Sequence, residues 1–161
     1  MIVLRDARAD EGTLIAGIQE RSSTAAYAHI FPPERYPFPR AGVHARWNAT
    51  LREPATQTIV AEVDDEPVGF ACVRAESLVA LYVVPERWGT GVAPALHDRT
   101  LEVVRGLGSE RCRLWVLEEN ARGRRFYERR GWREDGRTQV VPFPPNPLEV
   151  GYTLDLEAPT Q

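Results

Sequence analysis

The sequence predicts a single α/β domain (α+β in its order of elements) that spans residues 1–161. Two observations support this class. Residues 77–84 form an almost continuous apolar run that leads through a glycine-containing loop into helical periodicity. Residues 58–75 contain two strand-like segments around a tight turn. The chain is long enough for one full core, and it contains no repeat or linker that would indicate a second domain.

The composition excludes several classes of protein. A net charge of -3 argues against a protein held to nucleic acid by phosphate neutralisation. All 20 basic side chains are arginine, which excludes a phosphate-loop lysine or a lysine Schiff base. No apolar run approaches membrane-spanning length, and the N-terminus lacks the apolar region of a signal peptide. We therefore expect a cytoplasmic protein without membrane association.

The first third of the chain predicts one strand and two helices. Residues 2–5 alternate as a short strand, and Asp10 is placed to cap a helix that runs toward Tyr27. Prolines and aromatics crowd residues 31–39, which cannot form regular helix. A second helix is expected over residues 43–51.

The middle of the chain predicts three strands followed by a helix. Residues 58–63 and 67–75 flank the turn at residues 64–66, as in an antiparallel hairpin. The apolar run over residues 77–84 is typical of a central strand covered on both faces. The helix after the glycines is expected to reach Leu107, where neighbouring glycines can end it.

The last third predicts strand, helix and two closing strands. Residues 112–117 form the strand, and Asn120 is placed as the N-cap of a helix that ends at Gly131. The closing strands are expected over residues 131–141 and 148–156. The predicted order is β-α-α-β-β-β-α-β-α-β-β.

The glycine loop between strand and helix indicates a phosphate site. Backbone around Gly89 and Gly91 can approach a ligand closely, and the following helix offers unpaired N–H groups and a favourable dipole. A Walker A loop is excluded because no Gly-Lys-Ser/Thr follows. A Rossmann fingerprint is excluded because Pro94 occupies its third glycine position. The loop alone leaves open an ordinary strand-to-helix turn.

Two motifs that follow one another in the sequence decide between a ligand site and an ordinary turn. The segments VVPERWGTGVA (83–93) and ENARGRRFYERRGW (119–132) resemble the strand, loop and N…FYxxxGF motifs of the GNAT superfamily of acetyl-CoA-dependent N-acetyltransferases. The segment VAEVDDEPVGFACV (60–73) looks like the hairpin that precedes them, and the resemblance covers residues 58–141. It implies a mixed central sheet of about six to seven strands with a splayed pair, and helices on both faces.

The resemblance also implies the chemistry and its residues. Acetyl would move from acetyl-CoA to a primary amine by direct attack in a ternary complex, without a metal. A backbone N–H near Val83 would stabilise the oxyanion, and Tyr127 would be the general acid toward the CoA sulfur. Asn120 would both cap its helix and contact the pantetheine arm. The implied acetyl-CoA contacts are Leu81, Tyr82, Val83, Val84, Trp88, Gly89, Thr90, Gly91, Val92, Ala93, Asn120 and Tyr127.

Three positions depart from the family pattern. Trp88 occupies the place of a Gln or Arg in the loop. Pro94 removes one N–H from the first helical turn. Trp115 stands where peptide N-terminal acetyltransferases often carry glutamate, which argues against an N-terminal peptide substrate.

The acceptor side is expected to use two loops rich in proline and aromatics. Tyr27 and Phe31 in the first loop, with Phe143 in the second, suit a small amine with an apolar part. The same aromatics could instead cover a core or form a homodimer surface. Glu118 is a candidate substrate contact. Glu118, Glu119, Glu86 or a water chain could act as the base.

Other activities remain as alternatives. The three histidines form no spaced cluster, so we expect no metal site. The alternatives left open are a CoA-binding regulatory module, a protein N-terminal acetyltransferase, and a nucleotide-binding protein of another class.

Overall fold

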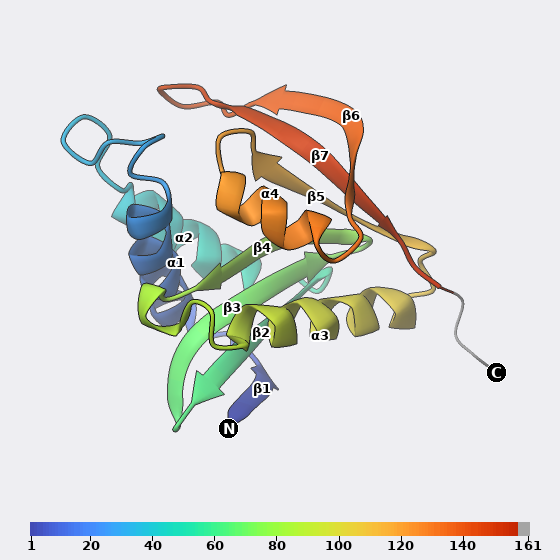
Figure 1. The fold of residues 1–161 in the computed structure, drawn as a ribbon. Coiled ribbons are helices and arrows are strands. Elements are labelled where there is room, and N and C mark those ends of the chain that lie inside the picture. The colour runs from blue at the N-terminus through green and yellow to red at the C-terminus, as the bar shows by residue number, and fades with distance from the viewer. Residues whose placement is uncertain (158–161) are drawn as a thin grey trace.

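The computed structural model describes residues 1–157 and contains one seven-stranded sheet, in the order β1-β2-β3-β4-β5-β7-β6 (Figure 1). The elements are β1 (Ile2–Asp6), α1 (Gly12–Ala26), α2 (Arg40–Thr50), β2 (Thr56–Val63), β3 (Glu66–Arg74), β4 (Ser77–Val83), the 3-10 turn η1 (Pro85–Arg87), α3 (Val92–Gly106), β5 (Arg111–Leu117), α4 (Ala121–Glu128), β6 (Arg133–Val140) and β7 (Leu148–Asp155).

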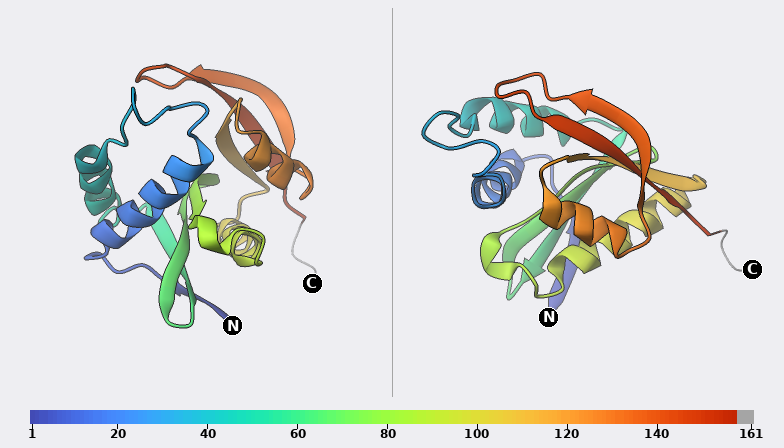
Figure 2. Two further views of the ribbon diagram at one scale, coloured as in Figure 1. Left: turned by 60° about the vertical axis from the view of Figure 1, so that its left-hand side comes forward. Right: turned by 45° about the horizontal axis from the view of Figure 1, so that its top comes forward.

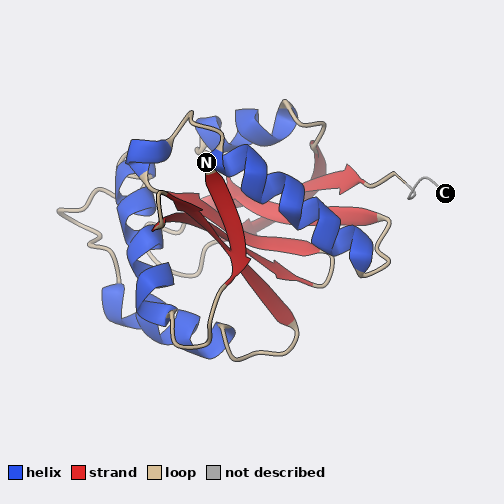
Figure 3. Cartoon of the chain, turned by 90° about the horizontal axis from the view of Figure 1, so that it is seen from below, coloured by secondary structure: helices blue, strands red, loops and turns tan. Residues whose placement is uncertain are grey.

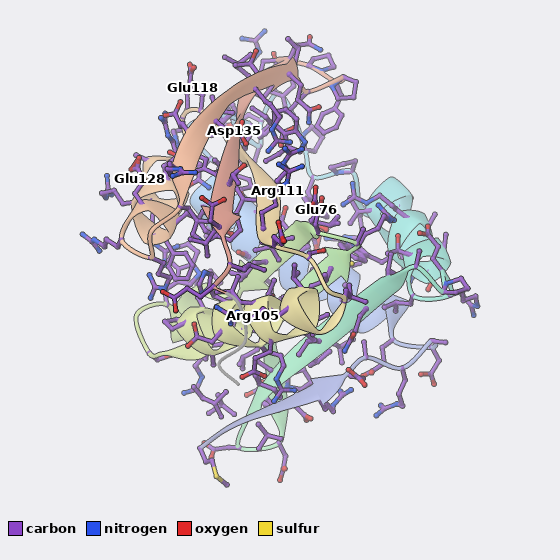
Figure 4. All side chains as sticks on the ribbon, turned by 90° about the vertical axis from the view of Figure 1, so that its right-hand side faces the viewer. Glu76, Arg105, Arg111, Glu118, Glu128 and Asp135 are labelled. Carbon is purple, nitrogen blue, oxygen red and sulfur yellow. The ribbon has the colours of Figure 1, made fainter. Side chains whose placement is uncertain are left out.

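The sheet is split between β4 and β5. All other neighbours pair antiparallel along most of their length, whereas β4 and β5 are parallel and pair only at Ser77 and Arg113. The Arg113 N–H donates to the carbonyl of Glu76 at 2.9 Å, and this bond closes the narrow end of the split. Figure 4 shows Glu76 and Arg111 side by side at that end. The sheet therefore consists of two halves that diverge from one point.

Helices cover both faces of the sheet. The helices α1 and α2 lie on one face of the β1–β4 half, and α3 lies on the other (Figure 2, left; Figure 3). Trp47 of α2 connects the two helices to the sheet. Its indole N–H donates to Gln19 of α1 at 2.6 Å, and its ring packs edge-on against Phe70 of β3. The predicted mixed sheet with a splayed pair and helices on both faces is confirmed. No helix among residues 1–157 is long and apolar enough to cross a membrane.

Most predicted elements are present, with shifts at their ends. The hairpin turn is confirmed, because Asp64 and Asp65 have φ of 52° and 64° as a tight hairpin turn requires. Asn120 caps α4, since its side chain accepts from the Gly123 N–H at 3.0 Å. The helix ends at Glu128 rather than Gly131, and the Trp132 N–H then turns back to the Tyr127 carbonyl.

Two expectations about burial and capping were wrong. The strand β4 is not covered on both faces, because Val79 is 41% exposed and Leu81 and Tyr82 are half-buried beside the split. Asp10 does not cap α1, which begins at Gly12 after Glu11 and has no side-chain cap. The nearest cation to Asp10 is the exposed Arg8, at 3.8 Å.

Glu11 instead ties the start of α1 to the sheet. Its carboxylate accepts two hydrogen bonds of 2.8 Å from Arg5 on β1 and one of 2.7 Å from the Arg8 backbone. These bonds, led by Arg5, lower the pKa of Glu11 to about 2. The side chain is only 6% exposed, so the pair is shielded from solvent.

Replacing Glu11 by Gln is expected to lower the free energy of unfolding at pH 7 by about 2 kcal/mol, because charge-assisted bonds are lost. The pKa is lower in the folded state, so this stabilisation is present above about pH 4.5 and is lost as the pH falls toward 2. Urea unfolding should thus show the wild type and the variant converging below pH 4.5. The exposed Glu102, paired to Arg99, is the control; if Glu102→Gln costs as much, Glu11 has no special role.

Candidate active site

The split forms a large cleft that passes between the two halves of the sheet. It has a volume of about 2210 Å³ and is lined by β4 and β5, the glycine loop, α4, the α1–α2 loop and the β6–β7 loop. Because the strands diverge, backbone groups of β4 and β5 that would pair in a continuous sheet face this cleft. The cleft therefore brings backbone donors together with side chains from both halves.

The backbone of β4 offers a free donor at Val83. The Val84 N–H donates to the Val68 carbonyl at 2.9 Å, and Tyr82 lies opposite Phe70 two residues earlier. In an antiparallel pair the intervening residues direct their N–H groups away from the partner strand. Leu81 and Val83 therefore present their N–H groups to the split, where an oxyanion would need them.

The glycine loop holds the N-terminus of α3 beside the cleft. Gly89 and Gly91 have φ of 74° and 94°, and a side chain at either would be strained. Gly91 is the N-cap residue, so the N–H groups of Val92 and Ala93 begin the helix without partners in the preceding turn. Pro94 follows within that turn and lines the cleft without blocking it. The loop has the open backbone and the dipole end that a pyrophosphate requires.

Trp88 has two partners that explain its place in this loop. Its indole N–H donates to the Val83 carbonyl at 2.7 Å, which fastens the loop to the end of β4. The guanidinium of Arg122 on α4 lies 3.8 Å from the centre of its ring. A cation from the other side of the cleft therefore stacks on Trp88, the residue that takes the place of the Gln or Arg of the loop motif.

Further arginines line this side of the cleft. They come from η1, from α4 and from the turn that follows α4, and they are Arg87, Arg122, Arg125, Arg129 and Arg130. A concentration of cations beside the α3 N-terminus favours a polyanionic ligand. The open glycine backbone, the unpaired N–H groups and these cations together fit the phosphates of CoA.

Tyr127 lies in an aromatic cluster on the α3 side of the split. Its ring packs edge-on against Phe126 and Trp132, with centroids 5.2 Å and 5.6 Å away. The Trp132 indole N–H donates to His97 Nε2 at 2.9 Å. The other ring nitrogen of His97 therefore carries the proton and donates to Asp98 at 3.1 Å. Burial lowers the pKa of His97, which keeps this acceptor neutral.

Three tyrosines approach one another through the split. Burial raises the pKa of Tyr127 well above its ordinary value, and Tyr82 contributes to the rise. Burial likewise raises the pKa of Tyr82 on β4 and of Tyr27 at the end of α1. All three phenols therefore stay protonated at neutral pH and can donate hydrogen bonds. The cleft is thus lined by three protonated phenols, those of Tyr27, Tyr82 and Tyr127.

Glu149 is a carboxylate of this region that the sequence analysis missed. It lies opposite Leu117 on β5 and lines the cleft, and Gln139 donates to it at 2.9 Å. It shares the cleft lining with Tyr27 and Tyr82, and its charge adds to the rise of both of their pKa values. No sequence signal separates it from other strand carboxylates, because only the β5–β7 register brings it to the cleft.

Trp115 forms the floor of the same face of β5. Arg137 on β6 lies 4.6 Å from the centre of its ring and pairs with Asp135 at 2.8 Å. The β7 residue beneath this pair is Gly151, where a Cβ would lie 2.6 Å from Asp135 Oδ1 and 2.8 Å from Arg137 Nε. Glycine at this position therefore makes room for the Arg137–Trp115 stack.

Two loops meet across the wide end of the split. Phe31 of the α1–α2 loop and Phe143 of the β6–β7 loop have ring centroids 6.1 Å apart. Below them, Tyr27 and Phe31 pack on a buried group formed by Ile30, Leu117 and Val141. His29 also lies 3.0 Å from the carbonyl of Glu119. The cleft is therefore bridged at its wide end as well as closed at its narrow end.

The structure brings most of the expected site residues to the cleft. Those that line it are Leu81, Tyr82, Val83, Trp88, Gly89, Gly91, Ala93, Asn120, Tyr127, Tyr27 and Phe31. Four expected residues do not line it. Val84 and Val92 have buried side chains, and Thr90 is exposed with its hydroxyl bound to the Arg87 carbonyl. Glu118 is exposed at the outer surface (Figure 4) and is not retained as a substrate contact.

Comparisons with known proteins agree with this geometry. The Acetyltransferase (GNAT) family matches residues 23–132. The peptidyl-lysine N-acetyltransferase YjaB of Salmonella typhimurium strain LT2 is 31% identical over 140 residues, which cover 87% of this chain and 89% of that protein.

Solved structures share the fold. A GCN5-related N-acetyltransferase of Rhodopseudomonas palustris has a TM-score of 0.80 at 20% identity, over 96% of this chain and 95% of that one. The PaiA N-acetyltransferase of Thermoplasma acidophilum, in complex with coenzyme A, has a TM-score of 0.69 at 18% identity, over 94% and 98%. With its split sheet and glycine loop, this chain belongs to the GNAT acetyltransferase family, whose members use acetyl-CoA.

Proposed function

We propose that this protein transfers acetyl from acetyl-CoA to a small primary amine by direct attack in a ternary complex. One observation carries the proposal. The free N–H of Val83 faces the cleft between Tyr127 on one side of the sheet and Glu149 on the other. An oxyanion donor, a proton donor and a carboxylate are the groups that aminolysis of a thioester needs.

Each group has one role in the proposed reaction, for which acetyl-CoA supplies the thioester. Glu149 accepts the proton that the amine loses as its nitrogen bonds to the acetyl carbon. The Val83 N–H stabilises the negative charge on the carbonyl oxygen. Tyr127, kept protonated by burial, donates toward the sulfur as the C–S bond breaks.

The bridged cleft supports a small acceptor over a peptide that threads through the site. A protein N-terminus would need a groove open at both ends, whereas the Phe31–Phe143 contact spans one end and the Ser77–Arg113 pair closes the other. This argues against the N-terminal acetyltransferase alternative, as does Trp115 on β5.

A lysine side chain of a protein is the second candidate acceptor. The relative with 31% identity is named a peptidyl-lysine N-acetyltransferase, and a lysine can enter such a cleft end-on. Rates of CoA thiol release, measured with free alkylamines and with an unstructured lysine peptide at equal concentration, distinguish these two acceptors. A higher kcat/KM for the free amines supports the proposal, and turnover of the peptide alone would replace it.

Gly91→Val is expected to weaken acetyl-CoA binding by at least about tenfold, because a branched side chain at φ of 94° distorts the phosphate loop. Calorimetric titration with acetyl-CoA measures the effect. Gly106→Ala is the matched control, since it lies at the far end of α3 in open space. Unchanged affinity in Gly91→Val would refute the phosphate-loop assignment.

Tyr127→Phe is expected to lower kcat by about 100-fold while acetyl-CoA affinity changes little, because the hydroxyl matters as the sulfur departs. Steady-state kinetics and calorimetry on the same samples give the two numbers. Tyr36→Phe removes a hydroxyl elsewhere in the cleft lining and serves as the control. A wild-type kcat in Tyr127→Phe would remove this residue from the chemistry.

Glu149→Ala is expected to lower kcat by about 100-fold, and added formate should restore part of the rate by replacing the missing carboxylate. The control is Glu118→Ala, which removes an exposed carboxylate outside the cleft and should leave kcat unchanged. Full activity in Glu149→Ala, or a loss in Glu118→Ala that formate restores, would reverse the assignment of the base.

A further inference from the structure

The acceptor half of the cleft carries an excess of positive charge. This half lies on the α1–α2 face of the split and is formed by the α1–α2 loop, α2 and the same-side residues of β3, β5, β6 and β7. Its charged lining residues are Arg35, Arg46, Arg74, Arg113 and Arg137 against Glu53 and Glu149. The whole chain has a net charge of -3, so this is a local concentration and not a general property.

Two of these arginines are neutralised by carboxylates. Arg74 pairs with Glu53 at 2.8 Å, and Arg137 pairs with Asp135 at 2.8 Å while it stacks on Trp115. These two pairs account for the charge at the edges of the acceptor half. They leave Glu149 as the one lining carboxylate of the described residues that can face a substrate there.

Two of the other three arginines have no close carboxylate, and the third has only a long ion pair. Among residues 1–157, no carboxylate oxygen lies within 4.0 Å of Arg35 or Arg46. Arg113 is 4.0 Å from Glu76, and its buried Nε has no hydrogen-bond partner in the described part of the chain. The charge of Arg113 is therefore not taken up by a hydrogen-bonded carboxylate, and its guanidinium can attract a ligand oxyanion.

Arg46 is held where it can meet an acceptor. Its guanidinium lies 5.4 Å from the centre of the Trp47 ring on α2, and its charge acts on the Tyr82 hydroxyl. Tyr82 lines the cleft together with Tyr127. Arg46 is exposed and lines the same cleft as Tyr82, so the distal group of an acceptor in the cleft can reach its guanidinium.

We propose that the acceptor is a small primary amine that also carries an oxyanionic group, a carboxylate or phosphate, which Arg46 binds with the support of Arg113 and Arg35. This inference rests on the proposed function. A planar guanidinium recognises such oxyanions with paired hydrogen bonds. The same charges repel a diamine or a lysine flanked by basic residues, which would bring a second cation into an arginine-lined cleft.

The test compares amines of equal length with different distal groups. The probes are 5-aminopentanoate, pentylamine and cadaverine, with 4-aminobutylphosphonate to distinguish phosphorus oxyanions from carboxylates. The wild type is expected to prefer 5-aminopentanoate over pentylamine by at least about tenfold in kcat/KM, and to use cadaverine least. Arg46→Met should abolish the preference by lowering kcat/KM for the anionic amines alone, with acetyl-CoA affinity unchanged.

The matched control is Arg52→Met, which removes an exposed arginine just after α2 that binds the Asn48 carbonyl and does not line the cleft. It should retain the preference. Equal use of pentylamine and 5-aminopentanoate by the wild type would overturn the inference, and so would a preference that survives Arg46→Met. Arg46→Glu should shift the preference toward cadaverine.

A binding measurement separates this inference from the proposed function. Calorimetry with N-acetyl-5-aminopentanoate and N-acetylpentylamine, in the presence of CoA, reports anion recognition without turnover. Tighter binding of the carboxylate that is lost in Arg46→Met, combined with no acetylation of any amine, would contradict the proposed function and support the anion site. Acetylation of all amines with no difference between the two N-acetyl compounds would support the function and refute the anion site.

Discussion

The site depends on the hydrogen bonds that β4 and β5 do not make. A continuous sheet would consume the N–H groups of Leu81 and Val83 in pairing, and the backbone of β5 would be consumed in the same way. Because the strands touch only at Ser77 and Arg113, these groups remain available on both edges of a cleft that runs through the sheet. Backbone alone then supplies the donors, which is why no distinctive side chain marks them.

The split is stable because other contacts hold its two ends. At the narrow end, Glu76 binds the Arg113 backbone, and Arg111 lies 3.5 Å from its carboxylate. At the wide end, the α1–α2 loop packs on residues of the opposite half and meets the β6–β7 loop. The His97–Trp132 bond joins α3 to the turn that follows α4, and Trp132 also packs against Tyr127. The aromatic loops thus have a structural role in addition to lining the acceptor side.

The fold was largely predictable because its signals are local. Alternation, apolar runs, turn residues and the Asn120 cap each act within a few residues, and they predict the elements and the family motifs. The acceptor side was less predictable because it depends on register. Glu149 reaches the cleft only through pairing with Leu117, and Arg137 reaches Trp115 only over Gly151. From spacing alone, Asp10 was a plausible helix cap and Glu118 a plausible substrate contact. In the structure, Arg5 binds Glu11 at the start of α1, and Glu118 is exposed just after the end of β5.

The unusual loop residues also follow from tertiary contacts. Trp88 fastens the loop to Val83 through its indole N–H, and Arg122 stacks on its ring. A cation is therefore present at this place in the loop, and it is supplied by Arg122 instead of by residue 88. Pro94 lies within the first turn of α3, where the helix retains the N–H groups of Val92 and Ala93. Neither residue distorts the cleft.

The most direct test of this account is amide hydrogen exchange along β4, measured by NMR with and without acetyl-CoA. The N–H groups of Tyr82 and Val84, bound to β3, should be protected in both states. Those of Leu81 and Val83 should exchange rapidly in the free protein and become protected by at least about tenfold when acetyl-CoA binds. Uniform protection of all four residues in the free protein, or no change at Val83 on binding, would contradict the claim that the split exposes the catalytic backbone.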